Sequence, residues 1–120
     1  MTRVYIAGPY SAPSVWEGLM NMNRGMRTAL WALKHGMSPF CPFFDYHFFL
    51  QLGEGEFLSV KQMKDYSMDW LEVSGAVLVL EGWEHSDGTK AEILRAKDLD
   101  IPVFYTREDL MGWVMKEAGG

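Results

Sequence analysis

The sequence feature that most constrains this chain is the stretch of residues 77–96, which reads VLVLEGWEHSDGTKAEILRA. It begins as an apolar run, continues through a polar loop that contains glycine, and ends with the spacing of a helix. Open α/β sheets bind their ligands outside the carboxyl ends of their strands, where such a loop lies. Glu92, in the first turn of the expected helix, therefore either faces a ligand pocket or has no partner there.

Short apolar runs alternate with amphipathic segments along the whole chain. Strands are predicted at Arg3–Ala7 and at residues 37–40, 77–80 and 101–105. Helices are predicted from Ser14 to Gly36, at residues 57–73 and 91–99, and from Thr106 onwards. Apolar strands that alternate with helices indicate a parallel sheet covered on both faces. The prediction is one α/β domain over residues 1–120, a small doubly wound parallel sheet with helices on both faces.

Apolar side chains recur at helical spacing in the first predicted helix and form one stripe, a pattern typical of a core-facing surface. The stripe comprises Trp16, Leu19, Met20, Met26, Leu30 and Leu33. The segment 41–56, CPFFDYHFFLQLGEGE, has no clear period and is either a loop with a helical turn that covers the site or a hydrophobic plug. The many aromatic residues and nine methionines fit an adaptable core together with an oligomer interface.

Composition excludes several classes of protein. The net charge is −5 without a basic cluster, which argues against binding to long nucleic acid. No apolar run reaches the roughly 18 residues that span a bilayer, so no membrane partner is expected. A single cysteine, Cys41, allows no intrachain disulfide and fits a reducing, cytoplasmic compartment.

Small polar residues surround Glu92 in the expected pocket loop, namely Ser86, Asp87, Gly88 and Thr89. Amides at the start of a helix can hold an anion beside such a carboxylate. The alternative is a capping box, in which Glu92 bonds back to the Thr89 amide and has no other role. Spacing alone favours the cap slightly.

A second candidate loop follows the first predicted strand and reads Gly8-Pro9-Tyr10-Ser11. Glycine there would let a ligand approach the backbone closely, although a Gly-Pro loop is most often a plain turn. The loop is neither a GxGxxG fingerprint nor a phosphate-binding GxxxxGK[ST] motif.

Other polar candidates are weaker. Asp65 and Asp69 share one face of the helix predicted before the third strand, where both are ordinarily solvated. Tyr5 is more often a core residue than a site residue, and Trp83 more often half-buried than a platform for base stacking. The histidines have no metal-ligand spacing with Cys41, so neither a metal nor another cofactor is expected.

Four motifs carry a resemblance to a known family: VYIAGPYS, GMSPFCPF, WLEVSGAVLVLEGWEHSDGTKAEILRA and IPVFY. The chain resembles the nucleoside 2-deoxyribosyltransferase-like superfamily, in particular a small phage and bacterial branch with a GWE-S-G-E signature. The superfamily also includes deoxynucleoside 5′-monophosphate N-glycosidases. The resemblance implies a five-stranded Rossmann-like fold and cleavage of an N-glycosidic bond. It further implies that Glu92 is the nucleophile, that Tyr5 lies near it, and that Gly8 belongs to the first loop of the site.

Two further positions follow from the same resemblance. Ser86 matches a position that is acidic in transferases of free nucleosides and serine in monophosphate glycosidases, which favours a 5′-monophosphate substrate. Gly88 and Thr89 would add donors at the helix start. The catalytic aspartate of the family falls on Ser67; of the two aspartates that flank it, Asp69 is favoured as the substitute because it is nearer the third strand.

Two functions are therefore compatible with the sequence. The first is an N-glycosidase or 2-deoxyribosyltransferase that acts on a (deoxy)nucleoside or its 5′-monophosphate. It would use Glu92, Asp69 and Tyr5 for catalysis and Gly8, Pro9, Ser11, Ser67, Trp83, Ser86, Gly88 and Thr89 for binding. The second is a nucleotide-binding or sensing module with the same pocket and little catalysis. In both cases a homodimer or higher homo-oligomer is expected, in the cytoplasm of a bacterium or a phage-infected cell.

Overall fold

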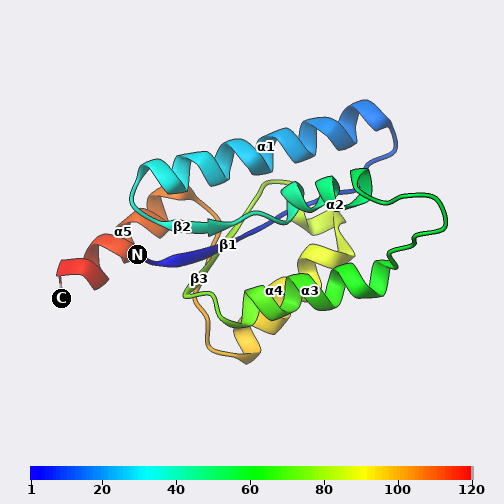
Figure 1. The fold of residues 1–120 in the computed structure, drawn as a ribbon. Coiled ribbons are helices and arrows are strands. Elements are labelled where there is room, and N and C mark those ends of the chain that lie inside the picture. The colour runs from blue at the N-terminus through cyan, green and yellow to red at the C-terminus, as the bar shows by residue number, and fades with distance from the viewer. Residues whose placement is uncertain (120) are drawn as a thin grey trace.

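A parallel sheet of four strands lies between two layers of helices in the computed structural model, which describes residues 1–119 (Figure 1). In the spatial order β2-β1-β3-β4, the strands are β1 (Arg3–Ala7), β2 (Ser38–Phe40), β3 (Ala76–Val79) and β4 (Val103–Phe104). Every neighbouring pair is parallel. The predicted doubly wound α/β sheet is confirmed, with the four strands expected from the chain itself; residues 1–119 hold no fifth strand.

The helices divide between the two faces of the sheet. They are α1 (Val15–Lys34) and α5 (Arg107–Gly119) on one face, and α3 (Val60–Glu72) and α4 (Asp87–Asp98) on the other. Successive strand residues point to opposite faces, so Val4 and Ile6 pack under α1 while Tyr5 and Ala7 face α3 and α4. This alternation places the hydroxyl of Tyr5 on the side of the sheet where α4 begins.

Side-chain caps fix where the helices begin. Ser14 accepts a hydrogen bond from the Glu17 amide at 3.2 Å, and Thr106 accepts one from the Asp109 amide at 3.1 Å, as predicted. Ser59 caps α3 in a reciprocal box with Gln62. None of the helices within residues 1–119 combines the length and the hydrophobicity that crossing a membrane requires.

The predicted core-facing stripe of α1 is wrong. The residues of α1 that are buried against the sheet are Gly25, Thr28, Ala29 and Ala32. Of the predicted stripe, only Met26 packs against the core, while Trp16 is 70% exposed and Leu19, Met20, Leu30 and Leu33 are exposed as well. Small side chains allow close approach: a Cβ at Gly25 would lie 2.2 Å from the Phe43 ring. The large apolar residues are consequently left on the outer side of the helix.

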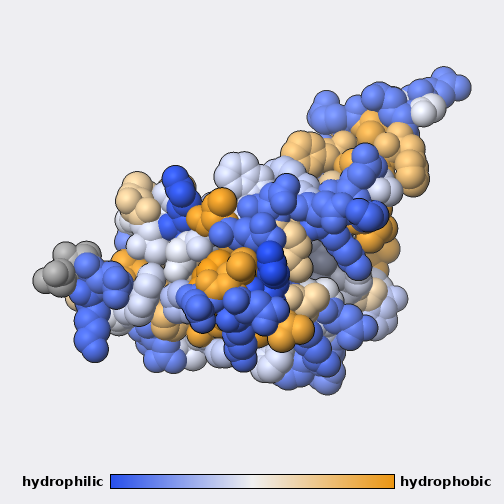
Figure 2. All heavy atoms as spheres, turned by 90° about the horizontal axis from the view of Figure 1, so that it is seen from below, coloured by the Kyte–Doolittle hydropathy of each residue, from blue (hydrophilic) through white to orange (hydrophobic). Residues whose placement is uncertain are grey.

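The aperiodic segment 41–56 forms two short helices and a projecting arm. A 3₁₀ turn, η1 (Pro42–Asp45), leads into α2 (Tyr46–Leu50), and the chain then extends away from the body before α3 (Figure 1). The arm is hydrophilic at its tip and hydrophobic at its base (Figure 2), and the molecule measures 52 × 26 × 26 Å. Phe43 is buried in the core while its neighbours line a cavity, so the segment is both a plug and a wall of the site.

Candidate active site

A cavity of about 730 Å³ opens beyond the carboxyl end of β1. Its walls come from β1 and its following loop, from η1 and α2, from α3, and from the first turns of α4. This volume lies within the roughly 300–1,000 Å³ typical of small-molecule sites. The position is the one that open α/β sheets use for ligands.

Tyr5 and Glu92 meet inside this cavity although 87 residues separate them in the chain. The fully buried Tyr5 hydroxyl donates a hydrogen bond to Oε2 of Glu92. β1 supplies the tyrosine because its alternation turns Tyr5 towards α4, and Glu92 lies on the second turn of that helix. A carboxylate held by one phenol in a ligand-sized cavity is positioned to react with a bound substrate.

Burial governs the protonation of this pair. Loss of water raises the pKa of Glu92 to about 7, although the hydrogen bond from Tyr5 lowers it. Burial, followed by the charge of Glu92, raises the pKa of Tyr5 far above its usual range. The phenol therefore keeps its proton at any ordinary pH, and Glu92 is the partner that gains and loses one near neutrality.

The alternative role of Glu92 as a helix cap is wrong. α4 begins at Asp87, four residues earlier than predicted, because Ser86 is its N-cap. The Ser86 hydroxyl accepts hydrogen bonds from the Thr89 amide at 3.2 Å and from the Thr89 hydroxyl at 2.8 Å. Glu92 is thereby left free of the helix terminus and turns to Tyr5.

The same two bonds define what Ser86 can do for a ligand. A hydroxyl has two acceptor positions and one donor, and Thr89 occupies both acceptor positions of Ser86. The remaining O–H of Ser86, which lines the cavity, is available to donate. Gly88 and Thr89 line the cavity beside it, so these three predicted binding residues lie together.

The structure divides the remaining predicted binding residues. Gly8 and Ser11 line the cavity, and a Cβ at Gly8 would meet the Leu80 side chain at 2.8 Å, so the first loop packs tightly on β3. Pro9 and Trp83 do not line it. Trp83 packs instead beside Tyr105, with ring centroids 5.4 Å apart.

The predicted catalytic Asp69 lies outside the cavity. Its side chain is exposed on α3, and Asp65 forms a surface ion pair with Lys61 at 2.7 Å. Ser67 and Met68, between the two aspartates in sequence, line the cavity instead. Neither aspartate reaches the site because a helix turns residues two positions away from Ser67 towards a different side.

Asp45 is a cavity residue that the sequence reasoning missed. Its side chain is only 8% exposed and lines the same cavity as Glu92. Burial raises the pKa of Asp45 to about 6, and the Ser67 hydroxyl lowers it by stabilising the carboxylate. The available signal was one acidic residue inside the aromatic run FFDYHFF, because such a residue is costly to bury without a purpose.

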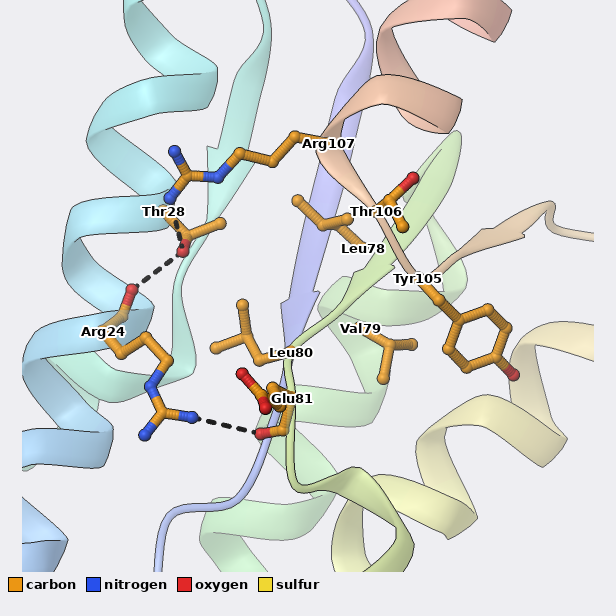
Figure 3. A pocket seen from close by; sticks show the side chains of 9 residues that line it. All are labelled: Arg24, Thr28, Leu78, Val79, Leu80, Glu81, Tyr105, Thr106 and Arg107. Carbon is orange, nitrogen blue, oxygen red and sulfur yellow. Dashed lines mark hydrogen bonds between the residues drawn. The ribbon is translucent and has the colours of Figure 1, made fainter.

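A second, smaller cavity of about 190 Å³ lies on the α1 side of β3 (Figure 3). Arg24 reaches across it to the Glu81 carbonyl at 3.3 Å, and Arg107 donates to the Thr28 hydroxyl at 3.3 Å (Figure 3). Arg107 also lies over the Trp31 ring at 5.1 Å. These contacts tie α1 to the ends of β3 and α5, so the arginines serve packing, and the volume is below that of typical ligand sites.

Comparison with known proteins supports the fold. Residues 2–106 match the family described as Domain of unknown function (DUF7768). No curated protein matches the chain in sequence. Among solved structures, the chain is similar to a 2-deoxyribosyltransferase from the psychrotolerant bacterium Bacillus psychrosaccharolyticus, with a TM-score of 0.59 and 21% identity over 85% of this chain and 69% of that one.

A conserved protein from Enterococcus faecalis V583 is similar as well, with a TM-score of 0.55 and 19% identity. The match covers 86% of this chain and 61% of that protein, so the chain spans less than two thirds of this neighbour. At such identities both likenesses show a shared fold, which agrees with the transferase-like architecture inferred from the motifs.

Proposed function

For this chain, which belongs to the DUF7768 family, we propose a function from the geometry of its site. The proposed reaction is cleavage or transfer at the N-glycosidic bond of a (deoxy)nucleoside or nucleoside 5′-monophosphate. The observation that carries the proposal is the hydrogen bond from the buried Tyr5 to Glu92 inside a cavity of about 730 Å³. A transferase of deoxyribosyl groups shares the fold. Both the carboxylate and the cavity are what a glycosyl-enzyme mechanism needs.

Glu92 acts as the nucleophile in this proposal. Its carboxylate oxygen forms a bond to the anomeric carbon while the bond from that carbon to the base nitrogen breaks, and the electron pair leaves with the base. Water, or a second base, then attacks the same carbon and releases Glu92. Tyr5 donates a hydrogen bond to Glu92, which orients the carboxylate and lowers its pKa so that more of it is ionised.

The sugar end of the substrate is expected beside the start of α4. Ser86 has a free donor there, and Lys64 and His85 line the same cavity, which favours a phosphate on the 5′ carbon. Asp87 also lines the cavity and opposes an anion. Rates with a nucleoside and with its 5′-monophosphate show whether the groups that attract the phosphate outweigh the repulsion by Asp87.

The first test is release of free base from a panel of nucleosides and 5′-monophosphates. Wild type is expected to release base from at least one of them, and Glu92→Gln is expected to release none. A second free base in the mixture distinguishes transfer from hydrolysis. If wild type is inert across the panel, or if Glu92→Gln releases as much base, the proposal is wrong.

Substrate class is tested by changing the charge at one position. Ser86→Asp replaces the free donor by a carboxylate and should move the preference from the 5′-monophosphate towards the nucleoside. The ratio of the two kcat/KM values is the readout. Asp87→Asn is the matched change in the opposite direction and should favour the monophosphate.

A binding module is the second candidate, because the aspartate expected to assist the leaving base, Asp69, lies outside the cavity. Without a proton donor the base leaves slowly, and the cavity would hold a nucleotide without turning it over. Calorimetry with the same panel separates the two candidates: tight binding of a nucleotide that stays intact overnight supports the module, and release of base supports the enzyme.

We also propose that the chain forms a homo-oligomer through α1. The exposed apolar residues of this helix lie on one side of it, opposite the small residues that contact the sheet. Monomeric proteins rarely expose many large apolar residues on one surface. Molar mass from light scattering during gel filtration tests the proposal.

A further inference from the structure

Asp45 is a buried carboxylate that has no role in the proposed reaction as described above. It lies at the junction of η1 and α2, where an aspartate ordinarily caps the helix that follows. Its side chain makes no capping hydrogen bond to α2, because its backbone is already helical at φ −64° and ψ −18°. A capping role therefore does not account for this residue.

An ion pair does not account for it either. Among residues 1–119 the salt bridges join Lys61 to Asp65 and Arg95 to Glu72, and neither includes Asp45. Burial of an unpaired carboxylate opposes folding, and the side chain is only 8% exposed. A buried carboxylate that no cation neutralises, in the wall of a ligand-sized cavity, is a candidate for chemistry.

The position of Asp45 relative to the Tyr5–Glu92 pair is the decisive observation. Asp45, Tyr5 and Glu92 line one cavity but come from three different elements, η1, β1 and α4. Ser67 of α3 lines the same cavity, and its hydroxyl lowers the pKa of both Tyr5 and Asp45. Asp45 therefore brings to this cavity the carboxylate that no residue of α3 supplies.

We infer that Asp45 is the acid and base of the reaction, a role that rests on the proposed function. In the first step Asp45 gives its proton to the leaving base as the carbon–nitrogen bond breaks and Glu92 bonds to the anomeric carbon. In the second step the Asp45 carboxylate takes a proton from the attacking water, the bond to Glu92 breaks, and both carboxyl groups return to their starting state.

The electrostatic setting agrees with this role. Burial raises the pKa of Asp45 to about 6, so a useful fraction of it holds a proton near neutral pH. The titratable groups that face it or share its cavity are Tyr5, Tyr10, Cys41, Tyr46, Lys64, Tyr66, His85, Asp87 and Glu92. Burial raises the pKa of Glu92 in the same cavity as well, to about 7.

The test compares two leaving groups. One is the base of the preferred substrate, which needs a proton to leave; the other is 4-nitrophenolate on the same sugar, which does not. Asp45→Asn should slow release of the base by roughly 10²–10⁴-fold while it keeps the initial burst of 4-nitrophenolate from the first step. Glu92→Gln should lose both, and Asp69→Asn, an exposed aspartate outside the cavity, should match wild type on both.

A double variant tests independently whether a carboxylate at this place in the cavity is what matters. It also replaces the first test if Asp45→Asn does not fold. Asp45→Ser combined with Ser67→Asp moves the carboxylate from η1 to α3 at the same centre. It should recover at least tenfold of the activity that Asp45→Ser loses, and Ser67→Asp alone should not exceed wild type.

The outcomes separate the two proposals. Wild type that is inert on every substrate overturns the proposed function and this inference together. Active wild type with a fully active Asp45→Asn overturns only the role of Asp45. Equal loss on both leaving groups also overturns the role as an acid, because a residue that only maintains the site would affect both alike.

Discussion

The two sides of the cavity differ in how they are built. The Glu92 side consists of the strand β1, which carries Tyr5, and the helix α4, which Ser86 caps. The Asp45 side is a short 3₁₀ turn and one helical turn inserted between β2 and α3. Regular elements hold Glu92, the proposed nucleophile, whereas an irregular segment supplies Asp45, the second carboxyl group.

This difference suggests a division of labour within one site. Tyr5 of β1 holds Glu92 of α4 through a hydrogen bond, which keeps the proposed nucleophile fixed. Asp45 lies in the short turn η1 at the start of the segment that continues into the projecting arm. A site of this kind can change its acid, or its preference for a leaving base, without disturbing the sheet.

Removal of the proposed nucleophile should give the largest effect. Glu92→Ala is expected to lower the rate of base release by roughly 10⁴-fold or more, as for other covalent nucleophiles. Asp69→Ala, on the exposed side of α3, is the matched control and should retain the wild-type rate. Steady-state release of base, followed by chromatography, is the measurement; comparable loss in both variants would mean that the fold and not the site was damaged.

Loss of the phenol should have an intermediate effect. Tyr5→Phe removes the hydrogen bond to Glu92, and a hydrogen bond to a charged group contributes about 1.5–3 kcal/mol, or roughly 10–100-fold in rate. Because this bond lowers the pKa of Glu92, its loss should also move the acid limb of the pH–rate profile to higher pH. A rate loss with an unmoved acid limb would contradict a role in ionising Glu92.

The sequence predicted the regular elements better than the irregular segment. The strands were predicted from apolar runs, and the helix starts at Ser14 and Thr106 from their spacing, because these features depend on local chemistry. The N-cap of α4 at Ser86 was not predicted, because Thr89 has an equally good capping pattern in the sequence. In the structure η2 (Trp83–His85) ends directly before Ser86, and α4 begins there.

Features that depend on contacts distant in sequence could not be predicted in this way. The hydrogen bond from Tyr5 to Glu92 spans 87 residues and was expected only through a family resemblance. Asp45 was missed because segment 41–56 has no period that assigns faces to its side chains. The inner face of α1 was misjudged because large apolar residues outnumber the Gly25, Thr28, Ala29 and Ala32 that contact the sheet.

Stability should depend on pH through the same two carboxyl groups. Burial raises the pKa of Glu92 to about 7 and that of Asp45 to about 6, so the folded state holds protons that the unfolded state has already released. The stabilising effect is complete below about pH 4 and is lost as the pH rises through 6 and 7, by roughly 3 kcal/mol for each carboxyl group before screening by solvent, which lowers both values.

Urea denaturation at pH 5 and pH 8 measures this effect. Wild type should be less stable at pH 8, and Glu92→Gln should remove most of that difference because glutamine does not ionise. Glu108→Gln, on the exposed first turn of α5, should leave the difference unchanged. If Glu92→Gln shows the full wild-type dependence on pH, burial does not perturb this carboxyl group in solution.

Substitutions on α1 should have the smallest effect on the site. Like the two sides of the cavity, the two sides of this helix differ in how well they are packed. Its inner side of small residues packs on the sheet, and its outer side exposes Trp16 and Leu19. If a second copy covers the outer side, wild type elutes as a dimer or larger species and Trp16→Glu with Leu19→Glu elutes as a monomer. Leu94→Glu, at an exposed leucine on α4, should keep the wild-type mass. Because both α1 changes lie on the outer side, the double variant should stay folded, and wild type that remains monomeric at high concentration would show that this apolar surface has another use.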